Sequence, residues 1–138
     1  MKIMVSACLL GENCKYNGGN NYSEKLANFT KGHTVIPVCP EILGGLPIPR
    51  SSCEIVDGVV LNKDGKSFDD EYHKGANRAL QIAKKENVDL MILQSRSPSC
   101  GVNQIYDGTF SGNKIEGHGV FASLAINEGY KVIDIEDL

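Results

Sequence analysis

Residues 69–94 read DDEYHKGANRALQIAKKENVDLMILQ and hold the strongest structural signal in the chain. Over residues 69–86, apolar and small side chains recur at helical spacing and form one stripe, which predicts an amphipathic helix. Acidic residues at its start and lysines at its end suit the helix dipole. Residues 89–94 follow as a short apolar run without alternation, which is typical of a strand covered on both faces. A helix that leads directly into a buried strand predicts an α/β protein.

Helices and strands continue to alternate outward from this pair. Further strands are predicted at residues 2–7, 34–38 and 130–135. A short helix is expected at residues 23–31, with Leu26 and Phe29 facing inward, and a last helix runs from Val120 to Gly129. This alternation predicts a three-layer, Rossmann-like α/β fold built on a mainly parallel sheet.

Turn signals interrupt this pattern in two places. Within residues 54–68, Asp57-Gly58 and Asp64-Gly65 lie between apolar runs, which predicts a small antiparallel hairpin insertion. Residues 37–52 hold four of the five prolines, and we expect a structured loop there.

Composition narrows the class of protein. The 138 residues are the usual size of one domain, so residues 1–138 are predicted to form a single α/β domain. The formal net charge of -3 argues against a nucleic-acid-binding protein, and no apolar run is long enough to span a membrane. Met1 to Leu10 resembles a short signal core but lacks a cleavage site. We expect a cytoplasmic protein, in which thiols stay reduced.

Three cysteines follow three of the predicted strands. Cys8 ends the first strand, Cys39 ends the second, and Cys100 lies just beyond the strand at residues 89–94. Ligands of parallel sheets bind outside the carboxyl ends of the strands. We therefore expect these thiols, although 31 and 61 residues apart in sequence, to meet at one edge of the sheet.

Thiolates gathered in this way select zinc, copper(I) or an iron–sulfur cluster. Structural zinc sites use closely paired cysteines, which this sequence lacks. A cluster held by three thiolates leaves one iron open for Lewis-acid chemistry. The alternative is that each cysteine is a small buried hydrophobic residue. For Cys14 and Cys53, in predicted loops, that alternative stands beside a role as a fourth ligand or a resolving thiol.

Glu41, Ser97 and Ser99 are the candidate catalytic residues. Glu41 follows Cys39 by two positions, so in an extended chain both side chains point the same way, and a carboxylate there can act as a general acid or base. Ser97 and Ser99 alternate in the same manner with Cys100, which suits hydrogen bonding to a substrate or cluster but also ordinary turn chemistry.

Two other groups are candidates for binding an anion. Arg50 and Arg96 are suited either to balance the charge of a cluster or to solvation at the surface. Residues 117–122, GHGVFA, match a Gly-rich pattern at a helix start and offer backbone N–H groups to an anion. The three histidines show no ligand pairing.

Several of these motifs together resemble a known family. The matching segments are VSACLLG at residues 5–11, PVCPE at 37–41, GLPIPR at 45–50, RSPSCG at 96–101 and IYDGTF at 105–110. They are similar to those of the thiouracil desulfidases, a small bacterial family formerly filed as a domain of unknown function. The resemblance implies a [4Fe–4S] cluster held by Cys8, Cys39 and Cys100, an acid–base glutamate at Glu41 and a supporting serine at Ser97 or Ser99.

The expected function is non-redox desulfuration of a small-molecule thiolated pyrimidine base, from thiouracil to uracil plus sulfide. Its rival is a non-catalytic iron–sulfur or zinc-binding module, such as a redox sensor, which a four-thiolate site using Cys14 or Cys53 favours. A third alternative is an enzyme with one nucleophilic cysteine, although no histidine lies near any cysteine in sequence.

Overall fold

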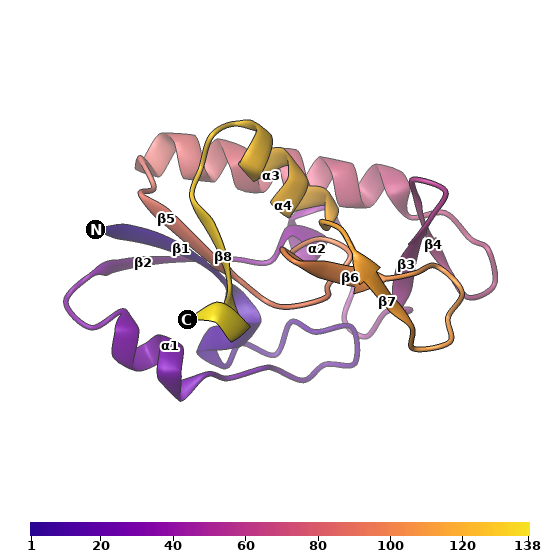
Figure 1. Ribbon diagram of the computed structural model, residues 1–138, viewed down its shortest axis with the longest axis horizontal. Coiled ribbons are helices and arrows are strands. Elements are labelled where there is room, and N and C mark those ends of the chain that lie inside the picture. The colour runs from indigo at the N-terminus through magenta and orange to yellow at the C-terminus, as the bar shows by residue number, and fades with distance from the viewer.

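A four-stranded parallel sheet forms the centre of the protein in the computed structural model, which describes residues 1–138. Its strands, in spatial order, are β2 (Thr34–Val38), β1 (Lys2–Ser6), β5 (Leu90–Leu93) and β8 (Val132–Asp134). All three neighbouring pairs are parallel, as Figure 1 shows. The predicted α/β fold with a mainly parallel sheet is confirmed.

Helices cover both faces of the sheet. On one face, α3 (Asp69–Glu86) and α4 (Val120–Asn127) pack on Met4, Met91 and Leu93. On the other face, α1 (Glu24–Phe29) and the 3₁₀ turn η1 (Ala7–Leu10) pack on Ile3, Val5 and Ile92. A final 3₁₀ turn, η2 (Ile135–Asp137), follows β8 on this second face (Figure 1). The strands are apolar on both sides because both sides are buried.

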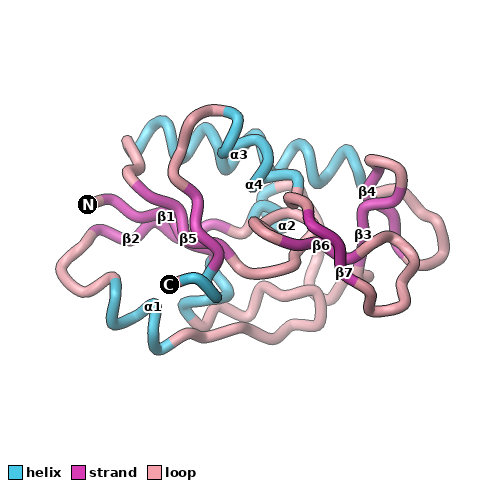
Figure 2. The backbone as a smooth tube through the Cα atoms, viewed as in Figure 1, coloured by secondary structure: helices cyan, strands magenta, loops and turns pink.

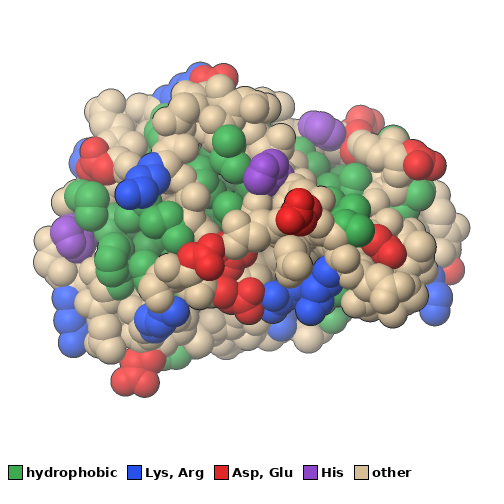
Figure 3. Space-filling model, in the orientation of Figure 1, with side chains coloured by type: hydrophobic (Ala, Val, Ile, Leu, Met, Phe, Trp, Pro, Cys, Tyr) green, Lys and Arg blue, Asp and Glu red, His purple; other side chains and the backbone are tan.

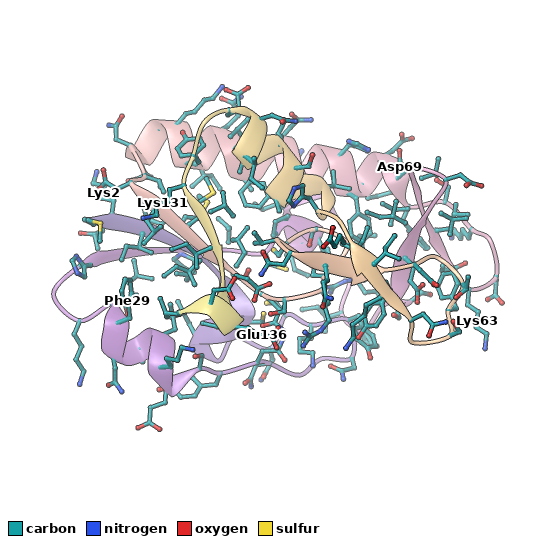
Figure 4. All side chains as sticks on the ribbon, in the orientation of Figure 1. Lys2, Phe29, Lys63, Asp69, Lys131 and Glu136 are labelled. Atoms are coloured by element: carbon teal, nitrogen blue, oxygen red, sulfur yellow. The ribbon has the colours of Figure 1, made fainter.

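Two antiparallel hairpins lie beyond the sheet. β3 (Cys53–Val56) and β4 (Val59–Asn62) are joined at Asp57-Gly58, as the turn signal predicts. β6 (Gln104–Tyr106) pairs with β7 (Lys114–Glu116) in the second hairpin (Figure 2). Asp69, labelled at the start of α3 in Figure 4, accepts a hydrogen bond from the Val60 backbone N–H at 3.0 Å. This bond ties the first hairpin to the long helix.

Two local predictions are wrong. The segment predicted as a loop at residues 37–52 contains a short helix, α2 (Pro40–Leu43). Proline suits the first position of a helix because its missing N–H has no partner there. Phe29 does not face inward: it is 40% exposed and stacks on His33, whereas Leu26 is fully buried (Figure 4 labels Phe29).

The surface mixes charges of both signs. On the face drawn in Figure 3, acidic and basic side chains lie interspersed, with hydrophobic side chains exposed between them. None of the helices combines the length and the apolar character that crossing a membrane requires.

Candidate active site

A cavity of about 260 Å³ opens at the carboxyl ends of β1, β2 and β5, and Cys8, Cys39 and Cys100 all line it. The strand register explains the convergence. Ser6, the last residue of β1, pairs with Val38, the last of β2, so the residues that follow both strands emerge at the same level. The sequence prediction that these three thiols share one edge of the sheet agrees with this geometry.

Each of the three cysteines is held by a different element. Cys8 lies in η1, where the side-chain amide of Asn21 donates to its sulfur at 3.5 Å. Cys39 precedes α2 as its N-cap residue and is half-buried. Cys100 is 5% exposed, follows the loop after β5, and lies near the buried hydroxyl of Ser6.

Burial keeps the free thiols protonated. It raises the pKa of Cys8 and, more strongly, that of Cys100 above the ordinary value, and the charge of a neighbouring Cys39 thiolate raises both further. A bound cation reverses this preference, because thiolates rather than thiols are metal ligands. Loading of a metal group onto this edge therefore releases protons.

The remaining two cysteines also line the cavity. Cys14 lies beside Cys39, whose sulfur is 3.9 Å from the Cys14 carbonyl oxygen. Burial, and then the neighbouring Cys39, raise the pKa of Cys14 to about 12. Cys53 is the first residue of β3 rather than part of a loop, and burial raises its pKa as well. All five thiols of the chain thus border one space.

The spacing of these donors argues against a single bound ion. No three His, Cys, Asp or Glu side chains lie close enough together to hold one metal ion. A tetrahedral zinc site needs its sulfurs on one centre, with Zn–S bonds of about 2.3 Å. An iron–sulfur cluster instead spreads its thiolates over separate irons. Three thiols around a cavity fit such a cluster better than they fit a mononuclear site.

Glu41 points into the cavity from the first turn of α2. Its Oε1 accepts hydrogen bonds from Arg50 Nε at 3.0 Å and from the Tyr72 hydroxyl at 3.1 Å. Its Oε2 accepts from Ser99 Oγ at 2.9 Å, and Ser97 Oγ lies 3.4 Å away. The expectation that Glu41 lies with the thiols agrees with this placement, but its stated reason is wrong, since the chain after Cys39 is helical and not extended.

The two serines have different hydrogen-bonding roles. Ser97 Oγ accepts from the backbone N–H groups of Ser99 and Cys100, at 3.1 and 3.0 Å. The Ser97 hydroxyl then donates its single proton to Ser99 Oγ, at 2.9 Å, and the Ser99 hydroxyl donates to Glu41 Oε2. Counting protons in this way gives a directed chain from Ser97 through Ser99 to the Glu41 carboxylate.

The Gly-rich segment at residues 117–122 was predicted to offer backbone N–H groups to an anion. In the structure the N–H groups at the start of α4 already donate to carbonyl oxygens of the protein. The N–H of Val120 donates to the carbonyl of Pro98, and those of Phe121 and Ala122 donate to the carbonyl of Ser99. Gly119 is required because a Cβ there would overlap the Ser99 backbone. The start of α4 therefore braces the serine loop against the cavity.

The remaining predicted groups are divided between the cavity and the surface. The side chain of Arg50 is 6% exposed and is paired with Glu41. Arg96 forms a two-bond ion pair with Glu136, which Figure 4 labels near the C-terminus. None of the cavity-lining residues is a histidine. Sequence reasoning missed the contacts of Asn21 and Tyr72: the first lies in a featureless polar loop, and the second occupies a core position of the α3 stripe, which hides its hydroxyl.

The fold and the cavity define an α/β protein with five thiols gathered at the carboxyl edge of a parallel sheet, a donor set of the kind that suits a soft-metal group. The profile of the family described as 2-thiouracil desulfurase matches residues 3–137, and the chain belongs to this family. It is 40% identical to the uncharacterized protein YbbK of Bacillus subtilis (strain 168), over 99% of this chain and 97% of that protein.

A solved structure agrees with the family assignment. The chain is similar to the [4Fe-4S]-dependent thiouracil desulfidase TudS (DUF523Vcz), with a TM-score of 0.93 and 34% sequence identity. The likeness covers 99% of this chain and 92% of that one. The resemblance drawn from the sequence motifs is confirmed at the level of the family.

Proposed function

We propose that this protein removes sulfur from a thiolated pyrimidine base, such as 2-thiouracil, by a non-redox reaction that depends on a [4Fe–4S] cluster. The observation that carries the proposal is the shared cavity: three thiols from three strand ends, the Glu41 carboxylate and two serines all line it. The similarity to TudS over nearly the whole chain supports it.

Cys8, Cys39 and Cys100 are the proposed cluster ligands. With one iron left open, the bound cluster supplies a Lewis acid that polarises a thiocarbonyl group. The donor set fits this group, since the thiols surround a cavity without forming a site for a single ion.

The chain's own residues provide orientation and proton transfer. Tyr16 and Tyr106 line the cavity and offer aromatic rings against which a pyrimidine can stack. Glu41 Oε2 takes the proton of the attacking water, and the Ser99 hydroxyl keeps that oxygen oriented. Water supplies the oxygen of the product carbonyl, the C–S bond breaks, and sulfur leaves as sulfide with the protons that water provided. No electrons are transferred to or from the base.

A direct assay tests this proposal. Protein reconstituted with iron and sulfide without oxygen should convert 2-thiouracil into uracil and one equivalent of sulfide, without an electron donor. Chromatography of the base and a sulfide assay, run with and without a reductant, measure both products. Strict dependence on the reductant contradicts the non-redox reaction, and no turnover of any thiolated base by cluster-loaded protein contradicts the function.

A second candidate function is a non-catalytic iron–sulfur module, and the position of Cys14 is the observation that favours it. Cys14 borders the same cavity and lies beside Cys39, so a fourth thiolate is available. Mössbauer spectra separate the two functions. If the parent shows one iron whose signal differs from the other three, the desulfidase is supported. If all four irons of the parent show thiolate ligation, and one of them loses it in Cys14→Ala, the module is supported.

A cysteine nucleophile is the least supported of the three functions. Burial raises the pKa of Cys8, Cys14, Cys53 and Cys100, so these thiols are poor nucleophiles. No histidine lines the cavity to act as a partner base.

A further inference from the structure

The two oxygens of the Glu41 carboxylate have different kinds of partners. Oε2 faces Ser97 and Ser99, whose loop also carries Cys100. Oε1 faces the opposite way and receives two donors, from Arg50 and Tyr72, which belong to other parts of the chain. Oε1 thus receives two donors, whereas Oε2 receives the Ser99 hydroxyl and has Ser97 Oγ 3.4 Å away.

Arg50 is held in place because each of its three guanidinium nitrogens donates a hydrogen bond. Nε donates to Glu41 Oε1 at 3.0 Å, Nη2 to the Cys14 carbonyl at 2.7 Å, and Nη1 to the Pro47 carbonyl at 3.2 Å. The backbone N–H of Arg50 also donates to the Tyr16 carbonyl at 2.8 Å. Since the planar fork has a fixed geometry, these three side-chain bonds fix the direction from which Nε approaches the carboxylate.

Tyr72 approaches the same oxygen from the long helix. It is 1% exposed, packs in a hydrophobic cluster with Leu46 and Val60, and directs its hydroxyl at Oε1 from 3.1 Å. Its ring has no room to turn, because the side chains around it are close-packed. Two rigid donors from separate elements therefore converge on one oxygen.

We propose that Arg50 and Tyr72 are positioning residues for the desulfuration, holding Oε1 of Glu41 so that only Oε2 is presented to Ser99 and the reacting atoms. The proposal rests on the proposed function and assigns it two residues outside the thiol, glutamate and serine set. Rotation of the carboxylate about its last torsion exchanges the two oxygens or turns both away, and two fixed donors oppose that rotation. Such control matters, since a misplacement of about 1 Å can lower a rate by roughly 10²-fold.

Two variants distinguish positioning from simple charge compensation. Tyr72→Phe removes only a hydroxyl and leaves the charge of Arg50 in place, while Arg50→Lys keeps a positive charge but loses the planar fork. If these residues position Glu41, each variant should lower kcat by roughly tenfold, with KM changed by less than about twofold, and each should retain the iron of the parent. Arg50→Ala should be slower still and should be partly rescued by guanidinium ion, at concentrations far below those that unfold the protein.

Matched controls come from the same chain. Lys74→Met removes an exposed positive charge from α3, the helix that also carries Tyr72, and Lys74 does not line the cavity. Tyr130→Phe removes a hydroxyl for which the structure shows no hydrogen-bond partner. The Tyr130 ring packs on the hydrophobic cluster between the sheet and helices α3 and α4. Both controls should turn over within about twofold of the parent.

Crystal structures of the variants provide a readout that does not depend on turnover. The Glu41 carboxylate should be rotated or disordered in Tyr72→Phe and Arg50→Lys, and unchanged in both controls. A carboxylate that keeps its orientation in both variants overturns the proposal, as does an unchanged kcat in an active parent. A third outcome separates the two proposals. If the Glu41 carboxylate moves in the variants while the parent is inactive on every thiolated base, the positioning of Glu41 is supported and the desulfidase function is overturned.

Discussion

Gly75 of α3 lies directly against Pro40 of α2, so closely that a Cβ on Gly75 would overlap the Pro40 carbonyl oxygen. The same contact leaves no room for a Cβ on Gly44, which faces the backbone of Glu71. Because α2 carries Glu41 and α3 carries Tyr72, this approach of two backbones brings the Tyr72 hydroxyl within 3.1 Å of the carboxylate. Two glycines therefore determine how the Glu41 carboxylate lies relative to Tyr72.

Gly75→Ala should destabilise the protein. Alanine is about 1 kcal/mol better than glycine inside a helix, but here its methyl group forces two backbones apart, and such overpacking costs about 1–3 kcal/mol. We expect a net loss of stability in urea unfolding and a lower rate, because α2 shifts away from Tyr72. Lys74→Ala, at the neighbouring exposed position, is the control and should stay within about 0.5 kcal/mol of the parent. A stabilised Gly75→Ala contradicts the close approach.

Iron retention should separate the five cysteines. Cys8→Ala, Cys39→Ala and Cys100→Ala should each lose most of the bound iron after anaerobic reconstitution, because each removes a thiolate at a strand end. Cys14→Ala and Cys53→Ala should keep it. Iron and acid-labile sulfide assays measure the outcome, and full retention in all of the first three variants contradicts the ligand assignment.

The cluster-free protein should lose stability as the pH rises through 9.0, the pKa of Cys14 in the unfolded chain, toward 12. Folding raises the pKa of Cys14 from 9.0 to about 12, so the unfolded chain gives up this proton first. Between these two pKa values the folded state holds more protons than the unfolded state. The free energy of unfolding is therefore highest below the unfolded pKa and falls as the pH rises toward 12. Urea midpoints measured under reducing conditions should fall less steeply with pH in Cys14→Ala than in the parent. Equal slopes contradict the shift.

The fold was predictable because its signals are local. The stripe and terminal charges of residues 69–86 match the bounds of α3, and the strand at residues 34–38 matches β2. The order β2-β1-β5-β8 was not predictable, since it depends on packing between distant segments. α2 was missed because prolines and glycines around it indicate a loop, and the four-residue helix is stabilised by its contact with α3 instead.

Only the part of the candidate site that follows the ends of the parallel strands was predictable from the sequence. Parallel strands bring their carboxyl ends together, so the convergence of Cys8, Cys39 and Cys100 follows from topology. The contact of Tyr72 with Glu41 joins residues 31 apart, and that of Asn21 with Cys8 joins a loop to a turn. Neither contact has a sequence spacing that indicates it, because both depend on how whole elements pack.

Glu41→Gln should keep the iron but lower any desulfurising rate by at least about tenfold, because only the proton-transfer group is removed. It should also destabilise the protein by about 3 kcal/mol, since the buried Arg50 loses its charged partner. Glu54→Gln is a matched control: Glu54 is buried, accepts hydrogen bonds from the backbone N–H groups of Gly108 and Phe110, and does not line the cavity that the thiols border. It should lose stability without losing rate. Iron loss in Glu41→Gln instead places Glu41 among the ligands or their support.

Ser97→Ala and Ser99→Ala should fail in different ways, although the two hydroxyls are 2.9 Å apart. Ser97→Ala leaves the N–H groups of Ser99 and Cys100 without their acceptor, and each such loss costs about 1–3 kcal/mol. The loop that carries Cys100 should loosen, so iron retention and unfolding free energy should both fall. Ser99→Ala removes no backbone partner, and alanine fits the fully buried position. It should therefore keep iron and stability but lose roughly tenfold or more in rate, because Oε2 of Glu41 loses its nearest donor.

Ser123→Ala, in α4, is the control and should match the parent in all three measurements. If Ser99→Ala loses iron while Ser97→Ala keeps both its iron and its stability, the direction of the hydrogen-bond chain from Ser97 to Glu41 is wrong.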